Sequence, residues 1–140
     1  MRYMILVKAN ADTEAGVNPG PEIFEAMGKL NEEMVNAGVL LAGEGLHPSR
    51  EGARVVHKDG RNVVVDGPFA ETKELIAGFW MLDVKSLDEA VEWANKVPGM
   101  QEGENLEIRR VFEIEDFPAD AFPPEAAARE QELRDRIANR

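Results

Sequence analysis

Residues 66–74, with the sequence DGPFAETKE, gather four charged side chains in a short connection directly before an apolar segment. A carboxylate whose pKa is shifted by a neighbouring ammonium can act as a general acid or base. Asp66 is the candidate for that role, with Glu71 and Lys73 as the groups that tune it. The alternative interpretation is structural: Asp66 caps a turn, and Lys73 pairs with a neighbouring carboxylate at the surface.

His47 is the second candidate for acid–base chemistry. It follows a glycine-rich stretch, residues 43–46, and is one of two histidines in the chain. Because imidazole titrates near neutral pH, we expect His47 to be the residue best suited to proton transfer. The alternative is a loop histidine that is solvated or bonded to the backbone. His57 lies beside a predicted turn and has no assigned role.

The sequence predicts no metal site and no bound cofactor. Cysteine is absent and the two histidines lack metal-ligand spacing, so a transition metal would depend on carboxylates alone. The glycine-rich motifs that bind phosphates or dinucleotides are absent, and so is the Gly-x-Ser-x-Gly motif of serine hydrolases.

A small-molecule pocket would need groups that orient its ligand. Arg54, on a predicted strand, could bind an anionic group or Glu44, because a guanidinium binds carboxylates bidentately. The alternative is an ion pair within the chain or across a dimer, which also applies to the arginines at 109–110. Phe69, Phe79 and Trp80 could line a small apolar pocket, although aromatic residues on strands more often belong to the core.

The composition narrows the classes of partner. The chain has 140 residues with 16 basic and 27 acidic side chains, a formal net charge of −11. Nucleic acid and anionic membrane surfaces require a cationic face, so neither is the expected main partner. No segment approaches the ~20 apolar residues that span a bilayer, and no signal-peptide pattern precedes the first strand. We therefore expect a cytoplasmic protein.

Hydrophobic periodicity predicts the order β-α-β-hairpin-β-α-β. Strands are expected at residues 3–7, 39–45, 53–57, 62–66, 75–84 and 106–114, and helices at residues 22–37 and 87–97. Residues 10–21 are expected to lack regular structure, and Asp59-Gly60 predicts the hairpin turn. Two βαβ units with an inserted hairpin indicate a ferredoxin-like α+β fold.

The predicted strand at residues 75–84 is apolar on both of its faces. A ferredoxin-like sheet has helices on one face only, so something apolar must cover the other. A second copy of the same sheet is the simplest candidate, and we therefore expect a homodimer. Residues 1–114 form the expected domain. Residues 115–140 form a C-terminal arm with a helical segment at 125–137, which packs on a partner or stays mobile.

Four separated motifs resemble the DGPF-domain proteins of the YCII-related family. In chain order they are GEGLHPS at residues 43–49, DGPFAETKE at 66–74, GFW at 78–80 and SLDEA at 86–90. The resemblance covers about residues 2–114. It implies a dimeric α+β barrel, in which two ferredoxin-like sheets face each other and enclose a cleft, in a bacterial protein whose reaction is unassigned.

The sequence departs from one feature of that family. In YCII-type members a histidine on the first helix and an aspartate after the second helix meet in the cleft. Here residues 22–37 contain no histidine, and Val97 stands before Pro98 where the aspartate is expected. Relatives that occur beside extracytoplasmic-function sigma factors imply a ligand-sensing or regulatory setting.

Two functions follow from these observations. The first is a homodimeric protein that binds a small anionic or aromatic metabolite in a cleft, in a ligand-sensing or sigma-factor-associated setting. The second is a small lyase- or isomerase-type enzyme with His47 and Asp66 as the catalytic residues. In both, the ligand-binding candidates are Glu44, Arg54, Phe69, Glu71, Lys73 and Trp80.

Overall fold

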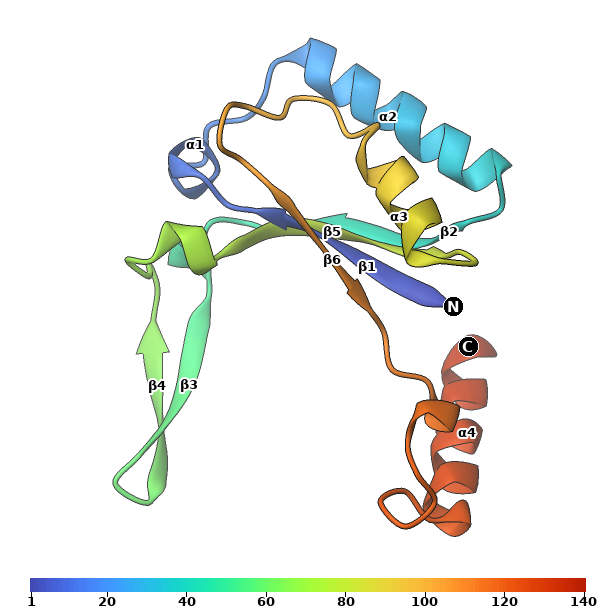
Figure 1. The fold of residues 1–140 in the computed structure, drawn as a ribbon. Coiled ribbons are helices and arrows are strands. Elements are labelled where there is room, and N and C mark those ends of the chain that lie inside the picture. The colour runs from blue at the N-terminus through green and yellow to red at the C-terminus, as the bar shows by residue number, and fades with distance from the viewer. The chain divides into compact units, whose positions relative to one another are not determined.

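The computed structural model describes all 140 residues, which divide into two compact units (Figure 1). The first unit is Met1–Arg110 and the second is Val111–Arg140. Both candidate cavities described below belong to the first unit.

The first unit contains a four-stranded antiparallel sheet. Its strands are β1 (Arg2–Lys8), β2 (Leu40–Gly45), β5 (Ile76–Asp83) and β6 (Leu106–Arg110). They lie in the order β2-β5-β1-β6, with every neighbouring pair antiparallel. When the inserted hairpin is set aside, this is the strand order of a ferredoxin-like sheet, so the predicted α+β fold is confirmed.

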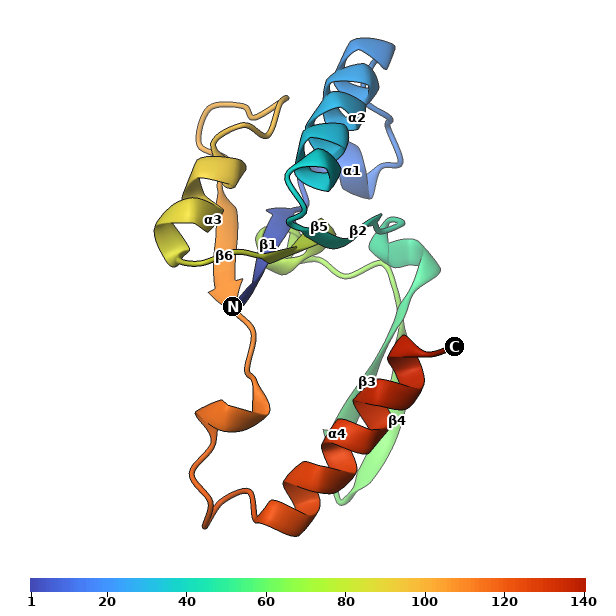
Figure 2. The ribbon, with the colours of Figure 1, turned by 90° about the vertical axis from the view of Figure 1, so that its right-hand side faces the viewer.

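Two helices, α2 (Pro21–Asn36) and α3 (Leu87–Ala94), lie on the same face of this sheet (Figures 1 and 2). Alternate strand residues point toward them, and Ile5, Met34 and Leu82 are fully buried in the resulting core. Each such side chain stabilises the fold by about 1.5–3 kcal/mol relative to an exposed position.

Trp80 belongs to this core rather than to a pocket. Its indole is 7 % exposed, and its Nε1 donates a hydrogen bond of 2.8 Å to Asn31 Oδ1 on α2. Gly43 lies opposite on β2, and a Cβ there would be 2.9 Å from Trp80 Cδ1. The glycine at position 43 therefore makes room for a core aromatic ring.

The opposite face of the sheet, which we call the open face, has an apolar centre. Met4 pairs with Met81 and Leu6 pairs with Phe79, and all four side chains are half-buried. The interpretation of residues 75–84 as apolar on both faces is therefore correct.

The inserted hairpin forms a separate two-stranded sheet, β3 (Ala53–Lys58) and β4 (Arg61–Asp66). Asp59 and Gly60 both have positive φ, 53° and 79°. This is the conformation that the two central residues of a type I′ hairpin turn require, so the Asp-Gly prediction is confirmed.

Three predictions about elements need correction. The connection after β1 contains a short helix, α1 (Ala11–Glu14), because Asn10 and Thr13 form a capping box at its start. Helix α3 ends at Ala94, before its predicted end. Strand β6 ends at Arg110 instead of residue 114, where the chain passes into the second unit, and Arg109 and Arg110 are exposed.

Short 3-10 turns connect several of these elements: η1 (Ser49–Glu51), η2 (Thr72–Glu74) and η3 (Ile114–Asp116).

The second unit contains η3 and α4 (Pro124–Ala138), close to the predicted helix at 125–137. Phe117 stacks on Phe112 with ring centroids 4.7 Å apart and contacts Phe122 edge-on at 5.6 Å. None of the helices has both the length and the apolar character that crossing a bilayer requires.

Candidate functional site

A cavity of about 490 Å³ lies at the end of the sheet where β1 finishes and β6 begins. Its floor includes Val7 and Leu106, which are register partners on these two strands. Its walls come from three segments: α1 with the connection that follows it, the first turns of α2, and the α3–β6 connection.

Local sequence signals shape these walls. Asn10 ends β1 and caps α1, with its Oδ1 accepting a hydrogen bond of 2.9 Å from the Thr13 amide. Pro21 begins α2, because proline is favoured in the first helical turn. Gly99 has φ +83°, a conformation that L side chains rarely adopt, and allows the α3–β6 connection to approach Ile23.

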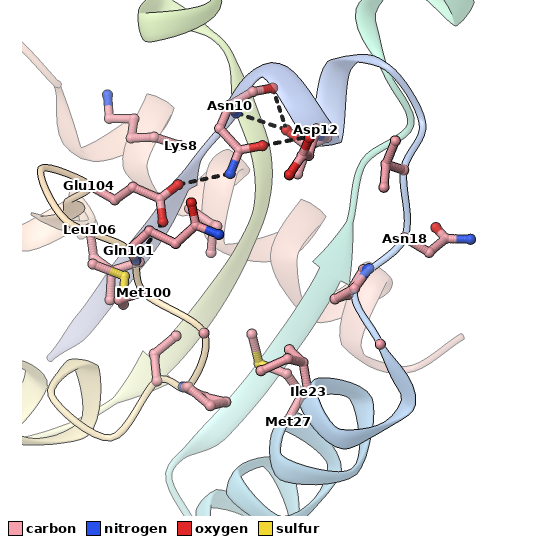
Figure 3. A pocket seen from close by; sticks show the side chains of 18 of the residues that line it. Lys8, Asn10, Asp12, Asn18, Ile23, Met27, Met100, Gln101, Glu104 and Leu106 are labelled. Carbon is pink, nitrogen blue, oxygen red and sulfur yellow. Dashed lines mark hydrogen bonds between the residues drawn. The ribbon is translucent and has the colours of Figure 1, made fainter.

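One side of the cavity is a hydrogen-bonded polar rim. Glu104 Oε2 accepts a hydrogen bond of 2.8 Å from Asn10 Nδ2, and its Oε1 accepts one of 2.7 Å from the Gln101 amide. Figure 3 shows this network, with Asn10 and Asp12 at the top of the view and Glu104 beside them. The rim joins the N-cap of α1 to the α3–β6 connection, so two segments 94 residues apart are held together.

The other side of the cavity is apolar. Ile23 and Met27 reach it from α2, at the bottom of the view in Figure 3, and Val97 and Pro98 reach it from the segment after α3. An apolar wall facing a few fixed polar groups is the usual composition of a small-molecule site.

Lys8 lines the same cavity, but its charge is already paired. Its Nζ lies 3.3 Å from Glu107 Oε1, and Glu107 Oε2 accepts a hydrogen bond of 3.2 Å from Arg109. The hydrogen bond from Arg109, followed by the hydrogen bond and charge of Lys8, lowers the pKa of Glu107. The carboxylates of Asp12 and Glu104 therefore dominate the charge at the cavity.

A second pocket, of about 280 Å³, lies beside the first. Leu46, His47 and Pro48 line it from the segment after β2, and Ala77 lines it from β5. The two pockets share residues 13 and 17–19, so the connection between α1 and α2 separates them.

His47 lines this second pocket and contacts a carboxylate four residues away. Its Nδ1 lies 2.8 Å from Glu51 Oε2, while 83 % of its side chain is exposed. A carboxylate on Nδ1 leaves Nε2 available to exchange a proton with a ligand.

A network that we call the Ser49 clamp connects α1 to the segment at 66–69. The Ser49 amide and hydroxyl donate to the two carboxylate oxygens of Glu14, at 2.9 and 2.5 Å. Ser49 Oγ in turn accepts a hydrogen bond of 3.0 Å from the Phe69 amide. The hydroxyl and then the amide of Ser49 lower the pKa of Glu14.

Gly67 completes this clamp through its lack of a side chain. A Cβ at this position would overlap the carbonyl oxygen of Ser49, and the Gly67 amide donates a hydrogen bond of 2.9 Å to the Gly52 carbonyl. The Gly67–Pro68 peptide bond is cis. The segment at 66–69 is thus packed directly on the backbone at 49–52.

The model of the YCII-related domain matches residues 1–115 of this sequence. The chain belongs to the YCII-related family. Helix α2 and the segment after α3 are the two places where the resemblance leads us to expect a histidine and an aspartate, and both line the large cavity of this YCII-related chain. They contribute Ile23, Met27 and Val97 to its lining and carry neither a histidine nor an aspartate.

A curated relative is an uncharacterized protein of Rhizobium meliloti (strain 1021), 39 % identical over 72 residues. The match covers 51 % of this YCII-related chain and 58 % of the relative, so the chain spans less than two thirds of that protein. Among solved structures, a similar one is the 5-chloro-2-hydroxyhydroquinone dehydrochlorinase (TftG) of Burkholderia phenoliruptrix AC1100, in complex with 2,5-dihydroxybenzoquinone. Its identity is 14 % and its TM-score 0.43, with 80 % of this chain and 94 % of that chain covered.

The polar residues predicted at positions 44, 47, 66 and 73 do not converge on one site in the structure. Glu44 points away from the helices on β2, opposite Phe79. Asp66 is exposed at the end of β4, and its carboxylate makes neither a hydrogen bond nor an ion pair. Glu71 and Lys73 are exposed in and beside η2 and line neither pocket.

Arg54 and Phe69 do meet. The guanidinium carbon of Arg54 lies 4.0 Å above the centroid of the Phe69 ring, a cation–π contact at the base of the hairpin. Of the residues predicted from the sequence, only His47 lines either of these two pockets.

The residues that line the large cavity were missed. Asn10 carried a usable signal, because an asparagine three residues before a threonine is compatible with a capping box. Glu104 and Ser49 carried none, because Asn10 and Glu14, the side chains that they bond to, lie 94 and 35 residues away along the chain.

Proposed function

We propose that this YCII-related protein binds a small molecule in the large cavity and acts in a ligand-sensing setting. The observation that carries the proposal is the cavity itself. Its volume of about 490 Å³ falls in the range of known ligand pockets, and its apolar wall faces a fixed polar rim. Its α2 wall presents Ile23 and Met27, which favour an apolar contact over proton transfer at that side.

The lining indicates the chemistry of the ligand. An aromatic or compact aliphatic body fits the wall formed by Ile23, Met27 and Val97, while hydroxyl or amine groups can donate to the rim. Since Lys8 is paired with Glu107 and two carboxylates lie at the rim, an uncharged or cationic ligand is favoured over the anionic one expected from the sequence.

A thermal-shift screen tests this proposal. The panel contains matched aromatic compounds that carry a hydroxyl, an amine or a carboxylate. A true ligand at 100 times its dissociation constant stabilises the protein by about 2.7 kcal/mol and raises Tm by several degrees in a concentration-dependent manner. Phenols and amines that raise Tm would support the proposal. A panel that leaves Tm unchanged would contradict it.

A second copy of the chain is the proposed partner. The open face presents Met4, Leu6, Phe79 and Met81, a contiguous apolar centre that a two-fold related sheet would bury. An association with a sigma factor is the further partner that the family resemblance suggests, and co-purification of the two proteins tests it.

His47 supports a second candidate function, an acid–base enzyme of the lyase or isomerase type. The supporting observation is that His47 lines the smaller pocket while its Nδ1 contacts the Glu51 carboxylate, a partner of the kind that orients the ring of a general base. Mass spectrometry of the same panel after incubation would reveal a converted compound. His47→Asn would abolish that conversion, and a conversion that survives it would contradict this candidate.

A further inference from the structure

The hairpin β3–β4 exposes an unusual amount of apolar side chain. Every residue of both strands is exposed, and five of them are valines. Their exposed fractions are 68 % for Val55, 65 % for Val64, 43 % for Val65, 40 % for Val56 and 36 % for Val63.

These valines occupy both faces of the hairpin. Val55 pairs with Val64, and the next pair along, Val56 with Val63, points to the opposite side. A hairpin that faces water on one side normally alternates apolar and polar residues, and a lone two-stranded hairpin is marginal in water. The valine pattern therefore indicates a hairpin that is covered when the protein functions.

The base of the hairpin is anchored to the rest of its unit. The Gly67 amide bonds to the Gly52 carbonyl, and the guanidinium of Arg54 lies over Phe69. From this base the hairpin projects away from α2 and α3, on the side of the open face of the sheet (Figures 1 and 2). The two apolar surfaces of the unit thus lie on one side of it.

The charge of the hairpin is opposite to that of the remaining chain. Residues 53–66 contain three basic and two acidic side chains, which gives the hairpin a net charge of +1. Because the whole chain carries −11, the remaining residues together carry −12. A second copy of the chain carries a net charge of −11 and has an apolar open face. Attraction between opposite potentials favours that encounter.

We propose that the hairpin β3–β4 is a dimerisation arm that packs against a second copy of this chain. In a two-fold dimer each arm reaches the partner, so both arms are covered by the same contact made twice. This inference rests on the homodimer proposed above. It adds the hairpin as a second part of the dimer interface, beside the open face.

Sedimentation velocity with threonine variants tests the arm. Threonine keeps the β-branched shape and strand propensity of valine but adds a hydroxyl, so the hairpin remains able to form. We expect the combined variant V55T/V56T/V63T/V64T to raise the dimer dissociation constant at least tenfold. Val35→Thr, at a valine of α2 that is 61 % exposed, is the matched control and should leave that constant unchanged.

Thiol labelling provides a second, independent readout. Because the chain has no cysteine, Val64→Cys introduces a unique thiol on the arm. We expect its labelling rate to fall at least tenfold at protein concentrations above the dissociation constant and to recover on dilution. Protection that does not depend on concentration would mean that the same chain covers the arm, and would overturn the proposal.

The outcomes separate the arm from the dimer. A protein that stays monomeric at all concentrations would overturn both. A dimer whose dissociation constant is unchanged by the four threonines, and whose Val64→Cys thiol labels at the monomer rate, would overturn the arm alone and leave the open-face dimer standing.

Discussion

The segment at 66–69 and the large cavity belong to the same unit but are built in opposite ways. The segment has a distinctive sequence, and its structural contribution comes from the backbone: Gly67 lies against Ser49, and Phe69 is held by its amide. The cavity has no sequence motif and is assembled from Asn10, Glu104 and apolar side chains of three separate segments. A distinctive motif can therefore mark a demanding backbone contact, while the proposed ligand site is formed elsewhere.

Gly67→Ala should have the largest effect among the variants that test this comparison. The added Cβ would overlap the Ser49 carbonyl oxygen, so the backbone must shift, at a cost of about 3 kcal/mol in the free energy of unfolding. Urea denaturation measures it. Gly45→Ala is the matched control, because a Cβ there meets nothing within 4 Å. Equal losses in the two variants would contradict the clamp.

Ser49→Ala should have the next largest effect. It removes the hydroxyl that donates to Glu14 and leaves the Phe69 amide without its acceptor, at a cost of about 1–3 kcal/mol. The same denaturation experiment measures it. Ser49→Thr keeps the hydroxyl and should recover most of the loss, and a threonine variant as unstable as the alanine variant would show that the hydroxyl is unimportant.

The clamp also predicts a dependence of stability on pH. The pKa of Glu14 is lowered in the folded protein by the hydrogen bonds from Ser49, from an ordinary value of 4.5. The unfolded chain therefore binds the proton more readily, and the stability that the pair contributes is present above pH 4.5 and is lost as pH falls through the lower folded pKa. Glu14→Gln should flatten the loss of stability over that range. An identical acid limb in the variant and the wild type would contradict the assignment.

Asp66→Asn should have the smallest effect. The carboxylate is exposed and makes no hydrogen bond, so its replacement should change the free energy of unfolding by no more than about 0.5 kcal/mol. A loss comparable to that of the neighbouring Gly67→Ala would show that Asp66 contributes to the clamp after all.

Sequence patterns were sufficient to predict the strands and turns whose signals lie within a few neighbouring residues. The continuous apolar runs at residues 3–7 and 75–84 predicted the strands β1 and β5, and Asp59-Gly60 predicted the hairpin turn. The extent of β6 was overestimated because the alternation of residues 106–114 continues after the strand leaves the sheet at Arg110.

The candidate site was predictable only in part. His47 was identified from its residue type, but its partner Glu51 was not. Trp80 was a candidate for a pocket, with the core as the alternative, and the sequence offered no signal for its bond to Asn31 across the core. Contacts between distant segments, such as Glu14 with Ser49, depend on the folded arrangement and leave no mark in local periodicity.

Isothermal titration of the best compound from the thermal-shift panel tests most directly whether the cavity, rather than the segment at 66–74, binds the ligand. Ile23→Phe fills the cavity from α2 and should weaken binding at least tenfold, while Asp66→Asn should bind as the wild type does. Unchanged binding in Ile23→Phe, together with lost binding in Asp66→Asn, would contradict the account.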